Sequence, residues 1–222
     1  MPVKNCHICL AGNLEQLKEL EELLPPDYSH LLCTKEKEKV QLRVKVSTKE
    51  DVEKWLEDFQ QSSGFTWRKA RTYPQSGRYN MFRADFRCQH RTYGTGPKNT
   101  NCPATLFLLL KRSMEDRRSR SSDKHMAEGY LMNISLRMDH NHRRLCADAL
   151  SKRDVSSTTT KKLEELFQRG HSPSSALDTL KYNLQEEEGE RYFLTAADRA
   201  MVPDIQFCYR LDKVCQVQVE ST

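Results

Sequence analysis

The alternation of apolar and polar residues between positions 65 and 142 constrains the fold of this chain more than any other feature. In RYNMFRADFRC, one set of alternate residues is apolar and the other is mostly charged. The stretches TWRKART, ATLFLLLKR and GYLMNISLRM are also strand-like. Alternation of this kind is typical of antiparallel strands with one face on a core and the other in water. The segment predicts a small antiparallel sheet of four strands.

The N-terminal flank combines helical and strand periodicity. Leucines at positions 14, 17, 20 and 24 form a helical stripe over residues 13–24, and VQLRVKV reads as a strand. Thr48 can cap a following helix, in which Val52, Trp55, Leu56 and Phe59 share one face. Residues 62–64, Ser-Ser-Gly, end that helix.

Helical periodicity returns after His142. Residues 160–169 form one expected helix, and Ser172 followed by Pro173 begins another. A further short helix is expected before Pro203, whereas residues 111–125 are polar and read as a loop. The expected organisation is an N-terminal flank (1–63), a sheet domain (64–145) and a helical C-terminal region (146–222).

Charge is unevenly distributed. Residues 66–153 contain 19 basic and seven acidic residues, a net charge of +12, while the remainder carries −7 and the whole chain +5. A basic middle between acidic flanks is typical of a nucleic-acid surface. A solvated, arginine-rich face without a partner is the alternative.

Two cysteines and two histidines stand at the expected strand ends. Cys88 ends one strand, Cys102 precedes Pro103 and the next strand, and His140 and His142 follow the last strand. Two thiolates and two imidazoles are a common tetrahedral ligand set for structural zinc. The spacing is loose, and buried cysteines are often simply small apolar side chains. A second site could combine Cys6 and Cys9 with His30 and Cys33.

The ordered segments SGFTWRKA, MFRADFRC, NCPATLFLLL and ISLRMDHNH resemble the landmarks of WRKY-type zinc domains. The same layout occurs in glial-cells-missing and FLYWCH domains. It also occurs in the N-terminal regions of Mutator-like transposases and of the far-red-impaired response proteins, which resemble this chain most. The resemblance covers about 80 of the 222 residues.

This resemblance implies a zinc ion bound by Cys88, Cys102, His140 and His142. It also implies DNA contact from the strand that runs from Trp67 to Tyr73, because a sheet edge can enter the major groove. The predicted contacts of that strand are Trp67, Arg68, Lys69, Arg71 and Tyr73, with Trp67 expected mainly in the core. Further basic residues would position the DNA backbone: Arg83, Arg87, Lys111, Arg112 and the cluster Arg117, Arg118 and Arg120.

The chain departs from the plant domain after Lys69. Ala70, Arg71, Thr72 and Tyr73 replace the tyrosine-glycine-glutamine-lysine continuation, so the DNA sequence preference does not carry over. The loop over residues 111–125 is longer than in the plant domain. The three acidic residues of a transposase active site are not identifiable, so we expect no transposition by this chain.

These features favour an α+β protein whose small antiparallel four-stranded zinc-binding sheet is flanked by helices. The expected function is zinc-dependent binding of double-stranded DNA, with the sheet in the major groove, by a nuclear, transposase-derived transcription regulator. The alternative is a zinc-stabilised adaptor that binds an acidic protein or RNA. No signal sequence, long apolar segment, phosphate-binding loop or catalytic triad is evident, so we expect an intracellular protein without enzymatic activity.

Overall fold

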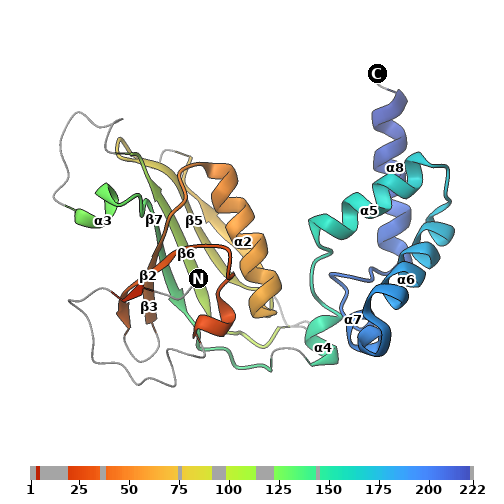
Figure 1. Ribbon diagram of the computed structural model, residues 1–222, viewed down its shortest axis with the longest axis horizontal. Helices are drawn as coiled ribbons and strands as arrows, with labels where there is room; N and C mark the ends of the chain where they lie inside the picture. The colour runs from red at the N-terminus through yellow and green to blue at the C-terminus, as the bar shows by residue number, and fades with distance from the viewer. Residues whose placement is uncertain are drawn as a thin grey trace. The chain divides into compact units, whose positions relative to one another are not determined.

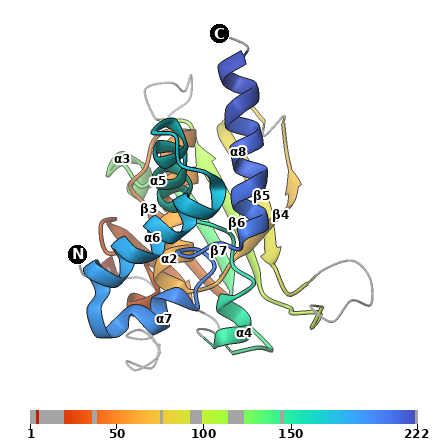
Figure 2. The same cartoon turned by 90° about the vertical axis from the view of Figure 1, so that its right-hand side faces the viewer.

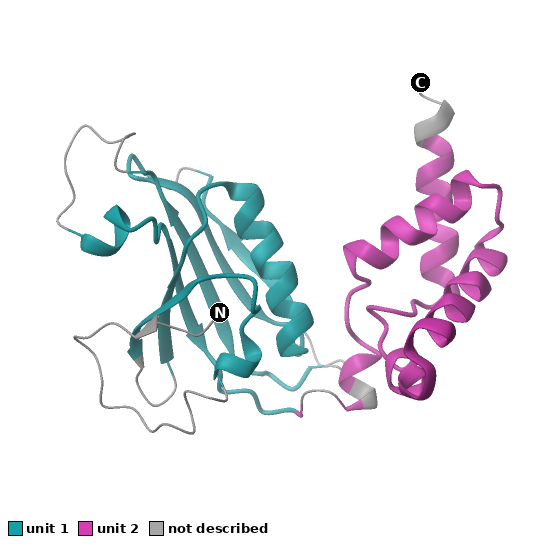
Figure 3. Ribbon diagram, viewed as in Figure 1, with its two compact units in different colours: residues 1–142 teal, residues 143–222 magenta. Residues whose placement is uncertain are grey.

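A computed structural model describes residues 4–5, 20–35, 39–74, 77–91, 99–113, 123–143 and 146–220. The chain forms two compact units, residues 1–142 and 143–222 (Figure 3), each with its own hydrophobic core. The N-terminal flank expected at 1–63 therefore belongs to the same unit as the sheet domain.

The first unit is built on one sheet of seven strands, ordered β1-β2-β3-β7-β6-β5-β4. The strands are β1 (Lys4–Asn5), β2 (His30–Lys35), β3 (Lys39–Val44), β4 (Trp67–Thr72), β5 (Asn80–Cys88), β6 (Thr105–Lys111) and β7 (Met132–Arg137). The two-residue β1 runs parallel to β2, and all other pairs are antiparallel, with β4 at one edge (Figure 2).

The α+β class and the antiparallel sheet are confirmed, but the count of four strands was wrong. The four strands predicted between residues 65 and 142 are β4, β5, β6 and β7. β3 extends them, because it pairs with β7 from Lys39↔Arg137 to Val44↔Met132. β2 then pairs with β3, so strands of the N-terminal flank widen the sheet.

Helix α2 (Lys49–Ser63) covers one face of the sheet (Figure 1). Its N-terminus is a capping box: the Thr48 side chain accepts from the backbone N–H of Asp51, and the Asp51 carboxylate accepts from that of Thr48. Gly64 ends the helix at φ 71°, in the left-handed region that glycine adopts without strain.

The core of the first unit lies between α2 and the apolar face of the sheet. Alternate side chains of β3, β5, β6 and β7 are buried on this face, as the alternation predicted. Trp55 stacks on Phe59 with ring centroids 5.0 Å apart, and Phe59 stacks on Trp67 at 6.5 Å. Aromatic packing thus ties the helix to the edge strand β4.

Two expected segments are described only in part. Residues 20–23 are helical, while the rest of the helix expected over 13–24 lies outside the described residues. The end of the loop expected over 111–125 forms the short helix α3 (Lys124–Ala127), which buries Met126. Arg117, Arg118 and Arg120 lie outside the described residues.

The second unit is helical. Its elements are α4 (Ala147–Leu150), α5 (Ser157–Gln168), α6 (Pro173–Glu188), the 3-10 turn η1 (Gly189–Arg191), α7 (Tyr192–Ala196) and α8 (Ile205–Glu220). Ser156 and Ser172 cap α5 and α6, and Leu163, Leu180 and Cys208 lie in their shared core. In the part of the chain that the structure describes, none of the helices is both long and apolar enough to cross a bilayer.

Candidate metal centre and basic edge strand

The four predicted ligands meet at one end of the sheet. Cys88 is the last residue of β5, Cys102 lies just before β6, and His140 and His142 follow β7. These three strands are adjacent and antiparallel, so the end of β5, the start of β6 and the end of β7 coincide. The topology alone therefore brings together residues that are up to 54 positions apart.

Their geometry suits a tetrahedral ion. The four ligand atoms all lie within 4.8 Å of one another, so the cluster could hold a metal ion. Sγ of Cys88 lies 3.1 Å from Nε2 of His142, Sγ of Cys102 lies 3.4 Å from Nδ1 of His140, and the two ring nitrogens are 3.2 Å apart. Around tetrahedral zinc, sulfur and nitrogen ligands are about 3.6 Å apart and two nitrogens about 3.3 Å apart. Small outward shifts of the sulfurs would complete that arrangement.

Burial shifts the pKa values of two residues in this cluster. Both cysteines are fully buried. Burial raises the pKa of the Cys88 thiol to about 12, with the neighbouring Cys102 adding to the effect. It also lowers the pKa of His140 to about 3, assisted by His142 and His90. The imidazole of His140 is therefore neutral and could bind a metal directly, whereas the thiol of Cys88 would have to release its proton on binding one.

Aromatic rings hold the two imidazoles in place. Phe65 stacks on His140 with centroids 3.7 Å apart and planes 3° apart, and Trp67 meets the same ring edge-on at 5.5 Å. His90 packs against His142 at 4.0 Å. In the described part of the chain, no hydrogen-bond partner reaches Nε2 of His140, so stacking on Phe65 and the contacts of Nδ1 within the cluster orient this ring.

The residue between the two histidines points away from the cluster, as two neighbouring ligands require. Asn141 is exposed and accepts a hydrogen bond from Oγ1 of Thr100 at 2.8 Å. Its amide also donates to the backbone carbonyl of Thr100 at 2.6 Å. This pair joins the segment before β6 to the segment after β7, beside the cluster.

β4 presents the basic side chains predicted to contact DNA. Trp67 is buried in the core, as expected, while every residue from Arg68 to Thr72 is exposed. A register shift between Lys69 and Arg71 interrupts the pairing with β5. An outer strand with three exposed cations is thus anchored at its start by Trp67, next to His140.

Tyr73 and Arg83 form a packed group beside that strand. The hydroxyl of Tyr73 donates to Asp85 at 2.7 Å, and its ring lies 4.0 Å from the guanidinium of Arg83 and 4.9 Å from that of Arg71. The structure therefore places Tyr73 where it orients two arginines.

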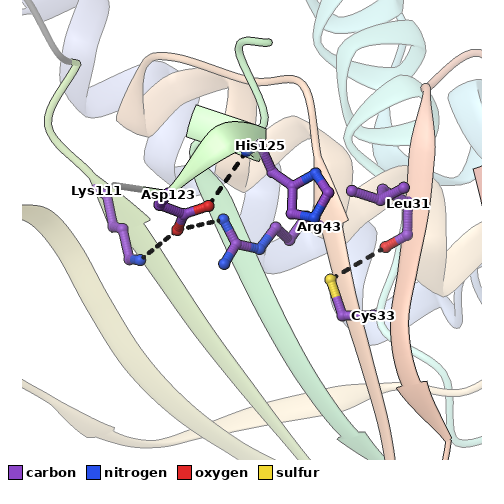
Figure 4. Close-up of polar contacts among 6 residues, drawn as sticks. All are labelled: Leu31, Cys33, Arg43, Lys111, Asp123 and His125. Atoms are coloured by element: carbon purple, nitrogen blue, oxygen red, sulfur yellow. Dashed lines mark hydrogen bonds and ion pairs between the residues drawn. The ribbon is translucent and has the colours of Figure 1, made fainter. Parts of the chain in front are cut away.

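The remaining predicted contacts lie farther from the edge strand. Arg87 lies opposite Arg68 in the sheet, and Arg112 is exposed just after β6. Lys111, at the end of β6 away from the Cys/His cluster, lies 3.4 Å from Asp123, which also pairs with Arg43 at 2.7 Å (Figure 4). Lys111 therefore already forms an ion pair with a carboxylate of the protein.

Of the four candidate ligands of a second metal site, the structure describes His30 and Cys33. Cys6 and Cys9 lie outside the described residues. Nε2 of His30 accepts a hydrogen bond from Nε1 of Trp55 at 3.1 Å, and the Cys33 thiol faces the backbone carbonyl of Leu31. His30 thus has a role in the core.

Two supporting residues of the cluster, Phe65 and His90, were missed in the sequence. His90 follows Cys88 by two positions and Phe65 precedes Trp67 by two, and this proximity to conspicuous residues was the available signal.

Comparisons of this chain with models of known protein families, with curated proteins and with solved structures found no match.

Proposed function

We propose that this chain is a zinc-dependent protein that binds double-stranded DNA through β4. The observation that carries the proposal is the exposed, basic outer strand, whose first residue packs against a ligand of the Cys/His cluster. The resemblance to WRKY-type domains supports the same function. It also supports a nuclear, transposase-derived regulator that acts with the sheet in the major groove.

Zinc is the metal that best fits the donor set. Two thiolates and two neutral imidazoles in a tetrahedral arrangement favour zinc over magnesium or calcium, which prefer oxygen ligands. Four protein ligands fill the coordination sphere, so the metal has a structural role. It would join β5, β6 and β7 at one end and stabilise the packing of β4 through Trp67 and Phe65.

DNA suits the shape and charge of the outer strand. The major groove is about 12 Å wide and admits a β-ribbon. Arg68, Lys69 and Arg71 can contact phosphates or the acceptor edge of guanine. Lys111 is expected to contribute less, because Asp123 offsets its charge within the protein.

The metal is tested first. We expect one zinc per chain in the purified protein, lost in Cys88→Ser and in His142→Ala but retained in the control Cys33→Ser. Both tryptophans lie in the first unit, and Trp67 is 5.5 Å from His140, so tryptophan fluorescence should change on chelation. Absence of zinc, or zinc retained in both ligand variants, would refute the metal site.

DNA binding is tested with fluorescence anisotropy on a pool of random-sequence duplexes across a range of salt concentrations. We expect affinity to fall steeply with salt and to weaken in Lys69→Gln/Arg71→Gln. The control Lys49→Gln/Lys54→Gln removes two exposed cations from α2 and should bind as the wild type does. Duplex binding that is unchanged in the β4 variant would refute a role for this strand. Binding of RNA or an acidic protein in place of duplex DNA would instead favour an adaptor.

A further inference from the structure

The register of the sheet aligns four basic residues and one threonine, one from each of five strands, into one row. Lys39 lies opposite Arg137, Arg137 opposite Thr105, Thr105 opposite Arg87, and Arg87 opposite Arg68. The row therefore crosses β3, β7, β6, β5 and β4 and contains four cations, one hydroxyl and no carboxylate. We call these five residues the basic row: Lys39, Arg137, Thr105, Arg87 and Arg68.

The basic row lies on the face of the sheet opposite α2. Its members alternate with the buried residues that pack under the helix, such as Val40, Leu136 and Leu106. Lys39, Arg137 and Arg68 are exposed, and the other two members are partly exposed. The row thus reaches the solvent across much of the width of the sheet.

Like charges lie directly opposite each other at two places in the basic row. Cations on neighbouring strands repel each other and destabilise a sheet. Here the repulsion occurs twice, at Lys39↔Arg137 and at Arg87↔Arg68. Arg137 also lies 3.3 Å from Asp139, but both side chains are about half exposed and this pair is screened by water. A polyanion laid along the row would turn the repulsion into attraction.

Elsewhere on this face, carboxylates lie among the cations. At the opposite end, Asp123 lies between Arg43 and Lys111 (Figure 4). In the middle, Asp85 lies opposite Arg71 and accepts from Tyr73. The basic row contains no carboxylate of its own and lies at the end of the sheet that also holds the Cys/His cluster.

We propose that the basic row binds the phosphodiester backbone of the DNA whose groove receives β4. This inference rests on the proposed function and adds Lys39 and Arg137, which β3 and β7 contribute. Strands are about 4.8 Å apart, so the row extends about 19 Å from β4. This length exceeds the width of the major groove, which is about 12 Å. The face of the sheet would therefore reach phosphates on the flank of the groove. Arginine, lysine and threonine all donate hydrogen bonds to phosphate oxygens.

The decisive variant is Lys39→Gln/Arg137→Gln, measured on the full, zinc-loaded chain with the random duplex pool. Each phosphate contact contributes about 0.9 to the slope of log K against log salt, so the slope should become shallower by about 1.8. If the affinity at 1 M salt is unchanged, that difference weakens binding about 60-fold at 0.1 M salt. Circular dichroism and the melting temperature verify that the variant remains folded.

The controls separate this inference from the proposed function. Lys49→Gln/Lys54→Gln removes the same charge from the opposite face and should leave the slope unchanged. If the wild type binds no duplex DNA, the proposed function fails together with the basic row. If the wild type binds and Lys69→Gln/Arg71→Gln weakens binding, while Lys39→Gln/Arg137→Gln keeps the wild-type slope, the basic row alone is refuted. Equal weakening in the row variant and the α2 control would also refute it, because net charge would then explain both.

Discussion

Acidification should destabilise the first unit through one buried histidine, His30. Nε2 of His30 accepts a hydrogen bond from Nε1 of Trp55 at 3.1 Å, which requires that nitrogen to be unprotonated. Burial lowers the pKa of His30 to about 4, from about 6.5 in an unfolded chain. Between pH 4 and pH 6.5, the unfolded chain binds this proton more readily than the folded chain does. The free energy of unfolding therefore rises with pH over this range, and stability is lost as the pH falls below 6.5.

The magnitude follows from the two pKa values. The full difference corresponds to about 3 kcal/mol of unfolding free energy, of which about 2 kcal/mol is lost between pH 8 and pH 5. The loss has a structural cause: the protonated ring can no longer accept from Trp55 and would place a charge in the core.

The assay compares wild type with His30→Gln by urea unfolding, followed by tryptophan fluorescence, at pH 8, 7, 6 and 5. Glutamine offers an acceptor oxygen for Trp55 but does not titrate. Acid also weakens the Cys/His cluster, but both proteins share that effect, so their difference isolates His30. We expect the variant to be less stable at pH 8 and to lose about 2 kcal/mol less than wild type by pH 5. Parallel pH profiles would refute the reasoning.

Three further predictions concern local structure. Thr48→Ala removes the capping box of α2 and should cost about 1 kcal/mol in urea unfolding, whereas Thr48→Ser should cost less; equal losses would exclude the cap as the cause. Gly64→Ala should cost about 1 kcal/mol by the same measurement, because φ is 71° there, and an unchanged midpoint would contradict this. Asp198→Asn removes the buried partner of Arg153 and should cost the second unit about 3 kcal/mol. That loss should appear in far-ultraviolet circular dichroism of the helices and leave tryptophan fluorescence unchanged, because both tryptophans lie in the first unit.

Local sequence signals predicted most strands and the main helix. The alternation in RYNMFRADFRC locates β5 within a residue, and Thr48 and Gly64 mark the limits of α2. These predictions succeeded because caps, left-handed turns and period-two alternation depend on neighbouring residues only. β2 was missed because its short apolar run, HLLCTK, does not alternate clearly.

Strand pairing could not be predicted in the same way. VQLRVKV was recognised as a strand, but alternation shows only that one face is buried, not which strand lies alongside. Its partner β7 lies about 90 residues later, so the pairing depends on tertiary contacts. α8 was missed for a different reason: VCQVQVE alternates like a strand, yet it continues a helix begun at Ile205.

The candidate ligands were recognisable because their chemistry is rare and their places at strand ends are regular. Cys88, Cys102, His140 and His142 could be chosen from the sequence, and the structure brings their ligand atoms together. The basic row was not recognisable. Lys39 and Arg137 become neighbours only through the pairing of β3 with β7, which no local pattern specifies.

The Cys/His cluster and the basic row occupy the same end of the sheet, and their charges indicate how they would act together. Arg87 immediately precedes Cys88, and Arg137 precedes His140 by three residues. Zinc with two thiolates and two neutral imidazoles has no net charge. The bound ion would therefore add no electrostatic attraction for DNA to that of the row. Any loss of DNA affinity would come from disorder at the strand ends that carry Arg87 and Arg137.

Co²⁺, which has the same charge and accepts the same tetrahedral ligands, should then restore both the fold and the salt dependence. Restored structure without restored DNA affinity would show that the metal does not act by ordering the row.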